Sequence, residues 1–167
     1  MTDSTTPPLH PDLAPLGDLV GAWSGAGTGS YPTIESFGYL EQISFTATPK
    51  PFLAYRQQTW ATDDGRPLHV EVGYLRIAAP GRVEWMISHP IGITELSEGT
   101  LIPTGTGFVL ALESTTIALS STAKSVTAVN RILRLAGDQL SYELEMAAVG
   151  HSMTHHLAAS LQKVPAA

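Results

Sequence analysis

The chain has 167 residues, of which 43% are hydrophobic and only 14% charged, a composition typical of one folded domain with a sizeable core. The formal net charge of -6 argues against nucleic acid as a partner, and the absence of cysteine excludes disulfides, thiolate-bound metals and iron–sulfur clusters. No apolar run approaches the ~20 residues that span a bilayer, and the first residues carry no secretory signal. We therefore expect a cytoplasmic protein that binds neither nucleic acid nor membrane.

The start of the chain reads differently from the rest. Residues 1–12 contain three prolines and no periodic apolar residues, so we predict a disordered lead-in. A short helical turn is expected within residues 14–20. Residues 13–164 are expected to form a single domain.

From Gly21 onward the chain is a succession of β-rich segments separated by turns. The clearest strands are predicted at residues 37–48, 52–61, 67–77 and 83–89. The sequence Asp63-Asp64-Gly65 is a strong hairpin signal, and further turns are predicted at 80–81, 103–107 and 137–138. About ten short strands without a helical period predict an all-β fold, a meander closed into a barrel or folded as a sandwich.

The best alternation of apolar and polar residues lies near the C-terminus. Its apolar positions are Leu140, Tyr142, Leu144 and Met146. The residues between them are Ser141, Glu143 and Glu145. This pattern predicts a strand with one buried and one solvated face.

The most unusual stretch, residues 21–32, places a glycine at every second position. A phosphate loop is disfavoured because no helix follows and no Gly-Lys-Ser/Thr ending occurs. On a strand, one face would carry Trp23, Gly25, Gly27, Gly29 and Tyr31. Two interpretations can hold together: a sharply coiled strand with Trp23 closing one end of a barrel, and a strand kept bare for a flat ligand.

The pattern GxWxGxGxGxYPT, from Gly21 to Thr33, resembles the signature of the nitrobindin family. Further matches run in order through residues 50–55, 65–71, 92–95, 122–124 and 155–157, so that the resemblance covers the chain from about Leu13. It implies a ten-stranded antiparallel up-and-down barrel, like those of lipocalins and fatty-acid-binding proteins, that holds a b-type haem. It also implies a haem-dependent enzyme that isomerises peroxynitrite to nitrate.

Adjacent histidines near the C-terminus compete for the iron. In an extended chain His155 and His156 point to opposite faces, so only one of them faces the cavity. Alternation groups His155 with Leu157, and groups His156 with Ala158 and the small or polar residues beyond it. The pattern leaves the choice open. The resemblance implies that His156 ligates the iron of one haem per chain and serves as the catalytic residue.

The resemblance also implies further contacts with the cofactor. Lys124 would reach a haem propionate, and Thr33 would make either a propionate contact or a distal contact. His69 or His89 would donate a hydrogen bond to an anion bound at the iron. Met146, from the alternating strand, completes this set of cofactor contacts. Surface or structural roles for these residues remain open at this stage.

The remaining polar residues are assigned to the surface. His10 and His151 are expected to be solvated, and a zinc site at His151 and His155 would require a helix that the sequence does not support. The glutamates on predicted strands are expected on the wet face of the barrel: Glu35, Glu41, Glu71, Glu84, Glu95, Glu98, Glu113, Glu143 and Glu145.

Two other functional classes are kept as alternatives. One is a non-catalytic carrier of nitric oxide, haem or a fatty-acid-like ligand, whose carboxylate would be held by Arg56, Arg76 or Arg131. The other is a dimerising structural module. The expected small-molecule partners are peroxynitrite and nitric oxide, and a homodimer is left open.

Overall fold

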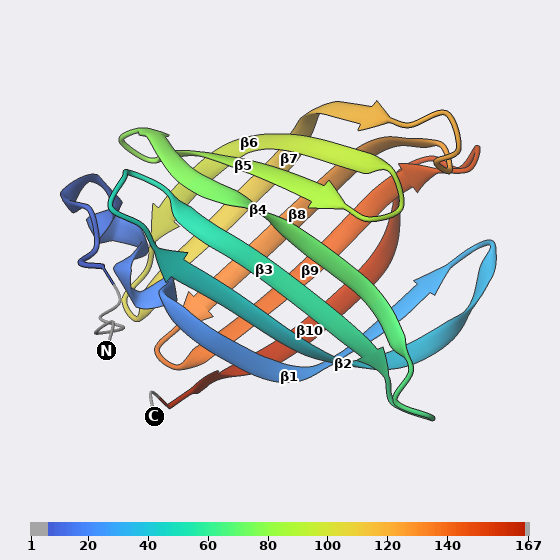
Figure 1. The fold of residues 1–167 in the computed structure, drawn as a ribbon, viewed down its shortest axis with the longest axis horizontal. Coiled ribbons are helices and arrows are strands. Elements are labelled where there is room, and N and C mark those ends of the chain that lie inside the picture. Colours follow the sequence, from blue (N-terminus) through green and yellow to red (C-terminus); the bar gives the residue numbers. More distant parts are fainter. Residues whose placement is uncertain (1–6, 166–167) are drawn as a thin grey trace, which may run out of the picture.

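The computed structural model describes residues 7–165, whose strands form a closed antiparallel barrel (Figure 1). The described strands are β1 (Gly21–Tyr31), β2 (Ile34–Ala47), β3 (Leu53–Ala61), β4 (Pro67–Ala79), β5 (Arg82–His89), β6 (Ile93–Pro103), β7 (Gly107–Leu119), β8 (Val126–Ala136), β9 (Gln139–Ala148) and β10 (Thr154–Val164). Each strand pairs with its neighbours in sequence, and β1 pairs with β10 to close the ring. The predicted ten-stranded up-and-down barrel is confirmed, and the sandwich is excluded.

The turns form where the sequence places them, while some strands are longer than predicted. Gly65 lies in the turn of the β3–β4 hairpin and has a φ of 72°, a conformation that favours glycine. Arg66 donates hydrogen bonds to Asp63 and, through its main-chain N–H, to Asp64. Strand β2 begins at Ile34, three residues before the predicted segment, because it pairs with β1 as far as Tyr31.

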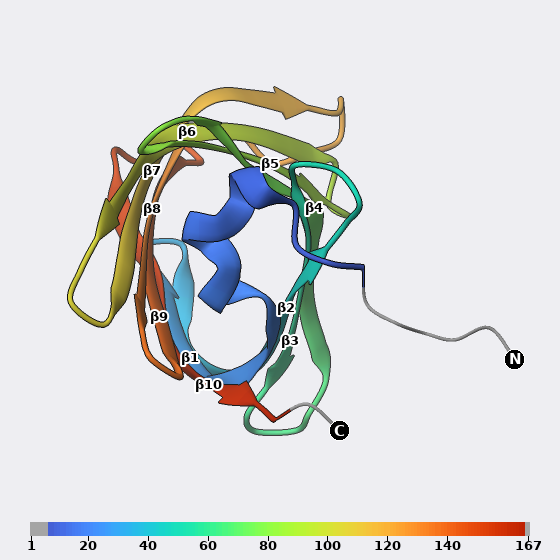
Figure 2. The ribbon, with the colours of Figure 1, turned by 90° about the vertical axis from the view of Figure 1, so that its left-hand side faces the viewer.

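A 3-10 helix, η1 (Pro11–Leu19), lies across one end of the barrel (Figure 2). Its buried residues Leu13, Leu16 and Leu19 recur every third position, which matches the three residues per turn of a 3-10 helix. The helix begins earlier than the predicted turn and includes Pro11 and Asp12, which we had predicted to be disordered. Proline suits the first helical position, and burial of Leu13 fixes this turn. The rest of the predicted lead-in includes residues 1–6, which lie outside the described residues.

Trp23 closes this end of the barrel together with the helix, as predicted. Its side chain is fully buried, and its indole N–H donates a 2.9 Å hydrogen bond to the carbonyl oxygen of Leu19. The ammonium group of Lys163 lies 5.1 Å from the centre of the Trp23 ring. The opposite end of the barrel, where the β1–β2 and β9–β10 turns meet, stays open.

The glycines of β1 make room for aromatic rings of β2. A Cβ atom at Gly27 would overlap the phenol ring of Tyr39 and lie 2.6 Å from the carbonyl oxygen of Ala158. A Cβ atom at Gly29 would overlap the ring of Phe37. The bare face of β1 is therefore covered by two aromatic side chains, which themselves line the cavity.

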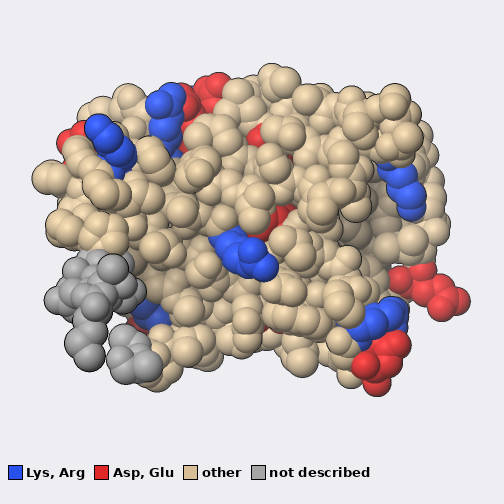
Figure 3. Space-filling view, in the orientation of Figure 1, with Lys and Arg blue, Asp and Glu red and all other residues tan. Residues whose placement is uncertain are grey.

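The outer surface of the barrel carries few charges. On the face shown in Figure 3 the charged side chains lie singly or in small groups among uncharged residues. The predicted alternation in β9 is confirmed, since Leu140, Tyr142 and Leu144 are buried while Glu143 and Glu145 are exposed. Within residues 7–165, no helix combines the length and the apolar character needed to cross a membrane.

Replacement of Gly27 by valine should destabilise the barrel. The new side chain would force apart Tyr39 and the main chain of Ala158, and overpacking of this kind costs about 1–3 kcal/mol. Urea denaturation followed by far-ultraviolet circular dichroism measures the loss. Gly105→Val is the matched control, because nothing lies within 4 Å of a Cβ atom at that turn position. Equal stability of the two variants would refute this account of the glycines.

Candidate functional site

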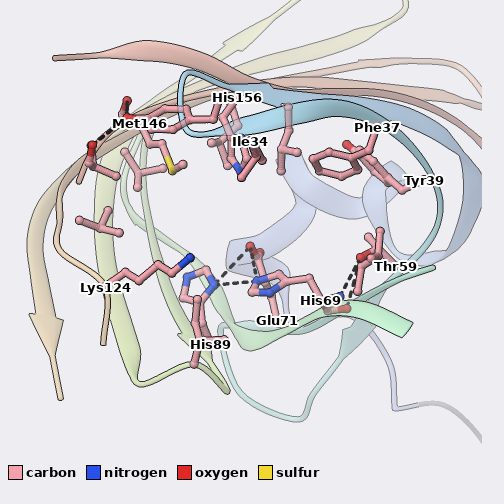
Figure 4. Close-up of a pocket in the computed structure, with 18 of the residues that line it drawn as sticks. Ile34, Phe37, Tyr39, Thr59, His69, Glu71, His89, Lys124, Met146 and His156 are labelled. Carbon is pink, nitrogen blue, oxygen red and sulfur yellow. Dashed lines mark hydrogen bonds and ion pairs between the residues drawn. The ribbon is translucent and has the colours of Figure 1, made fainter. Parts of the chain in front are cut away.

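The open end of the barrel leads into a cavity of about 800 Å³. This volume lies in the ~300–1,000 Å³ range that is usual for small-molecule and cofactor sites. All six residues predicted to contact a cofactor line it: Thr33, His69, His89, Lys124, Met146 and His156. Thr33 lies in the β1–β2 turn. Lys124 lies in the loop before β8, two residues ahead of Val126, and not at the start of a strand as the sequence predicted. Both therefore belong to the rim, while Met146 projects from β9 beside His156 (Figure 4).

His156 enters the cavity because of a β-bulge in β10. His155 pairs with Glu145 and Leu157 pairs with Leu144, so His156 is the extra residue between them. His156 and Leu157 both line the cavity, whereas His155 is exposed. The predicted grouping of His156 with Ala158 was therefore wrong, because the bulge interrupts strict alternation.

The imidazole of His156 is held in one orientation by the main chain. Its Nδ1 lies 3.0 Å from the carbonyl oxygen of Ser30, an acceptor that requires a proton on Nδ1. Burial lowers the pKa of His156, although the hydrogen bond to Ser30 acts in the opposite direction. The ring of Tyr31 packs edge-on against the imidazole, with centroids 5.5 Å apart. The neutral ring therefore keeps its Nε2 lone pair free.

The wall across the cavity from His156 is made by β4 and β5. In the ring of strands β5 lies five places from β10 in either direction, and Figure 4 shows His69, Glu71 and His89 facing His156 across the pocket. Nε2 of His69 and Nδ1 of His89 share a 3.0 Å hydrogen bond. The two histidines that the sequence treated separately thus form one pair.

A buried ion-pair network supports this wall. Arg131 of β8 donates hydrogen bonds to Glu71 at 3.3 Å and to Glu95 at 2.9 Å. Burial is the largest influence and acts to raise the pKa of each carboxyl, but the Arg131 guanidinium and the contacts with His69 and His89 together outweigh it. The pKa of Glu95 falls to about 2, and that of Glu71 falls well below its usual range. Tyr55 donates a 2.9 Å hydrogen bond to Glu71. Both glutamates are therefore ionised inside the barrel.

Glu41 lies deeper in the barrel and behaves differently. Gln57 and Tyr142 donate hydrogen bonds of 2.6 Å and 3.0 Å to its Oε1, whereas its Oε2 has no partner among the described residues. Burial raises the pKa of Glu41 to about 7, against the effect of those two hydrogen bonds. Tyr142 also shares a 2.8 Å hydrogen bond with Tyr39. This chain of side chains contains a carboxyl that holds a proton readily.

Three glutamates were therefore misplaced by the sequence interpretation. Glu41, Glu71 and Glu95 are buried, not on the wet face. The spacing of residues along the strand contained the signal. Glu41 lies two residues from Tyr39 and two from Ile43, so all three share the inward face of β2. For Arg131 the sequence predicts only one role, that of holding the carboxylate of a ligand in a carrier protein. No local pattern in the sequence links it to Glu71, sixty positions away.

The other histidines lie outside the cavity lining. His151 is exposed, as predicted, and His10 caps η1 by accepting a hydrogen bond from the main-chain N–H of Asp12. A zinc site formed by His151 and His155 on one helix is excluded, because β10 begins at Thr154 and no helix contains the two residues.

Comparison with known proteins identifies the family of the chain. Residues 12–163 match the family model described as "THAP4-like, heme-binding beta-barrel domain". The chain is 54% identical over 155 residues to a Nocardia farcinica protein named "Peroxynitrite isomerase", with 93% of this chain and 92% of that protein covered. It is 51% identical over 155 residues to a Mycobacterium avium protein named "Peroxynitrite isomerase 2", with 93% and 96% covered.

A solved structure shows the same fold. The crystal structure of Rv2717c from M. tuberculosis superposes with a TM-score of 0.92 at 49% sequence identity. The match covers 95% of this chain and all of that one. The barrel and its connections are therefore common to the two proteins.

Substitution of Glu41 by glutamine should change how stability depends on pH. Because the folded-state pKa of Glu41 is raised from 4.5 to about 7, its contribution to stability is complete below pH 4.5 and is lost as the pH rises through about 7. Glutamine does not titrate, so we expect Glu41→Gln to gain about 1–3 kcal/mol over the parent between pH 4 and pH 8. Urea denaturation at both pH values measures this.

Glu145→Gln, on the exposed face of β9 and without an ion pair among the described residues, controls for the loss of one charge. A Glu41→Gln variant that parallels the parent at both pH values would show that folding does not raise the pKa of Glu41.

Proposed function

Because the chain belongs to the THAP4-like haem-binding β-barrel family, we propose that it isomerises peroxynitrite to nitrate at one b-type haem whose iron is bound by His156. This family assignment agrees with the resemblance to nitrobindins. The proposal assigns the cavity at the open end of the barrel to the haem. His156 would act both as the iron ligand and as the catalytic residue.

One observation carries the proposal: the orientation of His156. Iron requires an unprotonated ring nitrogen, and histidines that ligate metals commonly donate their other N–H to a carbonyl oxygen or a carboxylate. Ser30 supplies that acceptor at Nδ1, and burial keeps the ring neutral by lowering its pKa. Nε2 is then the atom that would bind iron.

The residues around the cavity also suit a porphyrin. Apolar side chains of β1, β2, β7, β9 and β10 provide surfaces for the macrocycle: Tyr31, Ile34, Phe37, Ile117, Leu144 and Leu157. At the rim, the exposed Lys124 offers an ammonium group and Thr33 a hydroxyl to the propionates. Met146, beside His156, would contact the same face of the macrocycle.

Ferric haem would supply a Lewis acid for the rearrangement of peroxynitrite, in which an O–O bond breaks and an N–O bond forms without an external oxidant or reductant. The chain would bind the anion on the side away from His156. There His69 and His89 line the cavity, and Nδ1 of His69, which lies outside their shared hydrogen bond, would be the donor to its oxygens. Nitric oxide would bind at the same position.

A fatty-acid carrier is the less favoured function. Its carboxylate would need a free buried cation, but Arg131 is already paired with Glu71 and Glu95. Arg56 is exposed, and Arg76 pairs with Glu84 on the outer surface. Among the described residues, these three arginines therefore leave no free buried guanidinium to hold a carboxylate.

Replacement of His156 by alanine should abolish tight haem binding, and His155→Ala should not. His156 faces the cavity, whereas His155, its neighbour in sequence, is exposed. Titration with hemin followed at the Soret band measures haem binding, and the nitrate yield from peroxynitrite measures isomerisation. We expect isomerisation to fall with haem occupancy in the first variant and to persist in the second.

Added imidazole distinguishes loss of the ligand from misfolding. It should restore the Soret spectrum of His156→Ala if the cavity is intact, because it replaces the missing ring. Haem loss in His155→Ala instead would refute the assignment of His156. A parent protein that binds hemin and leaves the decay of peroxynitrite unchanged would refute the enzymatic function.

A further inference from the structure

Three side chains able to ligate a metal converge on the β4–β5 wall, apart from His156. They are His69, Glu71 and His89, and their nearest ligand atoms lie within 4.8 Å of one another. We propose that these residues form a second metal site, which binds a divalent transition cation such as Zn²⁺ facing the open cavity. The proposal does not depend on the haem, because His156 is on the opposite wall.

The spacing of the ligand atoms carries the inference. Nε2 of His69 lies 3.0 Å from Nδ1 of His89, and Oε1 of Glu71 lies 3.6 Å and 3.5 Å from these two atoms. A tetrahedral ion with ligand bonds of ~2.0–2.1 Å keeps its ligands roughly 3.3–3.4 Å apart. The three atoms thus form one face of a tetrahedron of the right size, and the fourth position opens into the cavity.

The groups behind the ligands have the arrangement found around bound metals. The second ring nitrogen of His89, Nε2, faces Oε2 of Glu95 at 3.6 Å, and a carboxylate behind a ligating histidine fixes the ring and increases its basicity. His69 and Glu71 lie two residues apart on the inward face of β4. The main-chain N–H of His69 donates a hydrogen bond to the hydroxyl oxygen of Thr59. The ligands therefore project from rigid strands.

The charge of this wall also favours a cation. Two carboxylates, Glu71 and Glu95, face the single guanidinium of Arg131, which can balance only one of them. Arg131 also reaches Oε2 of Glu71, so it can keep that contact when Oε1 turns to a metal. Lys124 is a further nearby cation, but it is exposed and has no ion-pair partner among the described residues.

The competing explanation is a purely structural hydrogen bond. Two neutral imidazoles can share one proton across the 3.0 Å contact, without any metal. In that case the residues would brace the cavity wall, and no cation would bind with a defined stoichiometry. Direct measurement of metal binding separates the two.

Isothermal titration of the full chain with Zn²⁺, in haem-free and hemin-loaded forms, tests the site. The parent should bind one Zn²⁺ per chain in both forms. His69→Ala and His89→Ala should weaken binding at least about a hundred-fold, since loss of even an outer-shell partner costs 10–100-fold. Both variants should still take up hemin, which shows that the barrel is folded.

Two further variants complete the design. His151→Ala, an exposed histidine outside the cavity lining, should bind Zn²⁺ like the parent. His156→Ala should lose haem and keep Zn²⁺, so that failure of the haem assignment and failure of the metal site give different results. Co²⁺ in place of Zn²⁺ should give the visible absorption of a tetrahedral site in the haem-free parent.

Three results would overturn the proposal. They are no stoichiometric Zn²⁺ binding by the parent, parent-like affinity in both His69→Ala and His89→Ala, and loss of Zn²⁺ binding only in His156→Ala. The last would place the ion on the haem ligand. Either of the first two would leave the histidine pair with the structural hydrogen bond alone.

Discussion

The burial of charge inside the barrel is the constraint on which the rest of the structure depends. Arg131 of β8 cannot stay inside without countercharges. Glu95 provides one from β6, two strands away in the ring, and Glu71 provides the other from β4, four strands away. The guanidinium also lies 5.8 Å from the ring centre of Trp85. This network divides the interior into a packed end, closed by η1 and Trp23, and an open end that can hold a ligand.

At the open end, an irregularity in the sheet does what regular alternation cannot. The bulge in β10 adds His156 to the cavity lining without removing Leu157, and β1 shifts its register with β2 between Gly29 and Tyr31. Ser30, whose carbonyl oxygen orients the imidazole, lies in that second irregular region. Two neighbouring departures from ideal strand pairing therefore determine the position and orientation of the His156 side chain. Bulges are common next to functional sites.

The two walls of the cavity have different chemistry. On one side a single neutral histidine is braced by the main chain and by Tyr31. On the other, two histidines rest on carboxylates that outnumber the buried cation. A ligand between them would meet an imidazole lone pair on one face and a polar, net acidic surface on the other.

The sequence by itself determined the strands, the turns and the family. The alternation of apolar and polar residues from Leu140 to Met146 and the glycine in the turn at Gly65 are local signals. The two-residue period of a strand and the positive φ of a turn glycine each depend on only a few neighbouring residues. The six candidate residues of the cavity also came from the sequence, four of them within the matched family motifs. Tertiary structure decided the rest. Which face of a strand turns inward depends on partners distant in sequence, so Glu41, Glu71 and Glu95 could not be placed until Arg131 and Tyr142 met them across the barrel. The bulge at His156 likewise exists only in the pairing of β10 with β9, which no local pattern encodes.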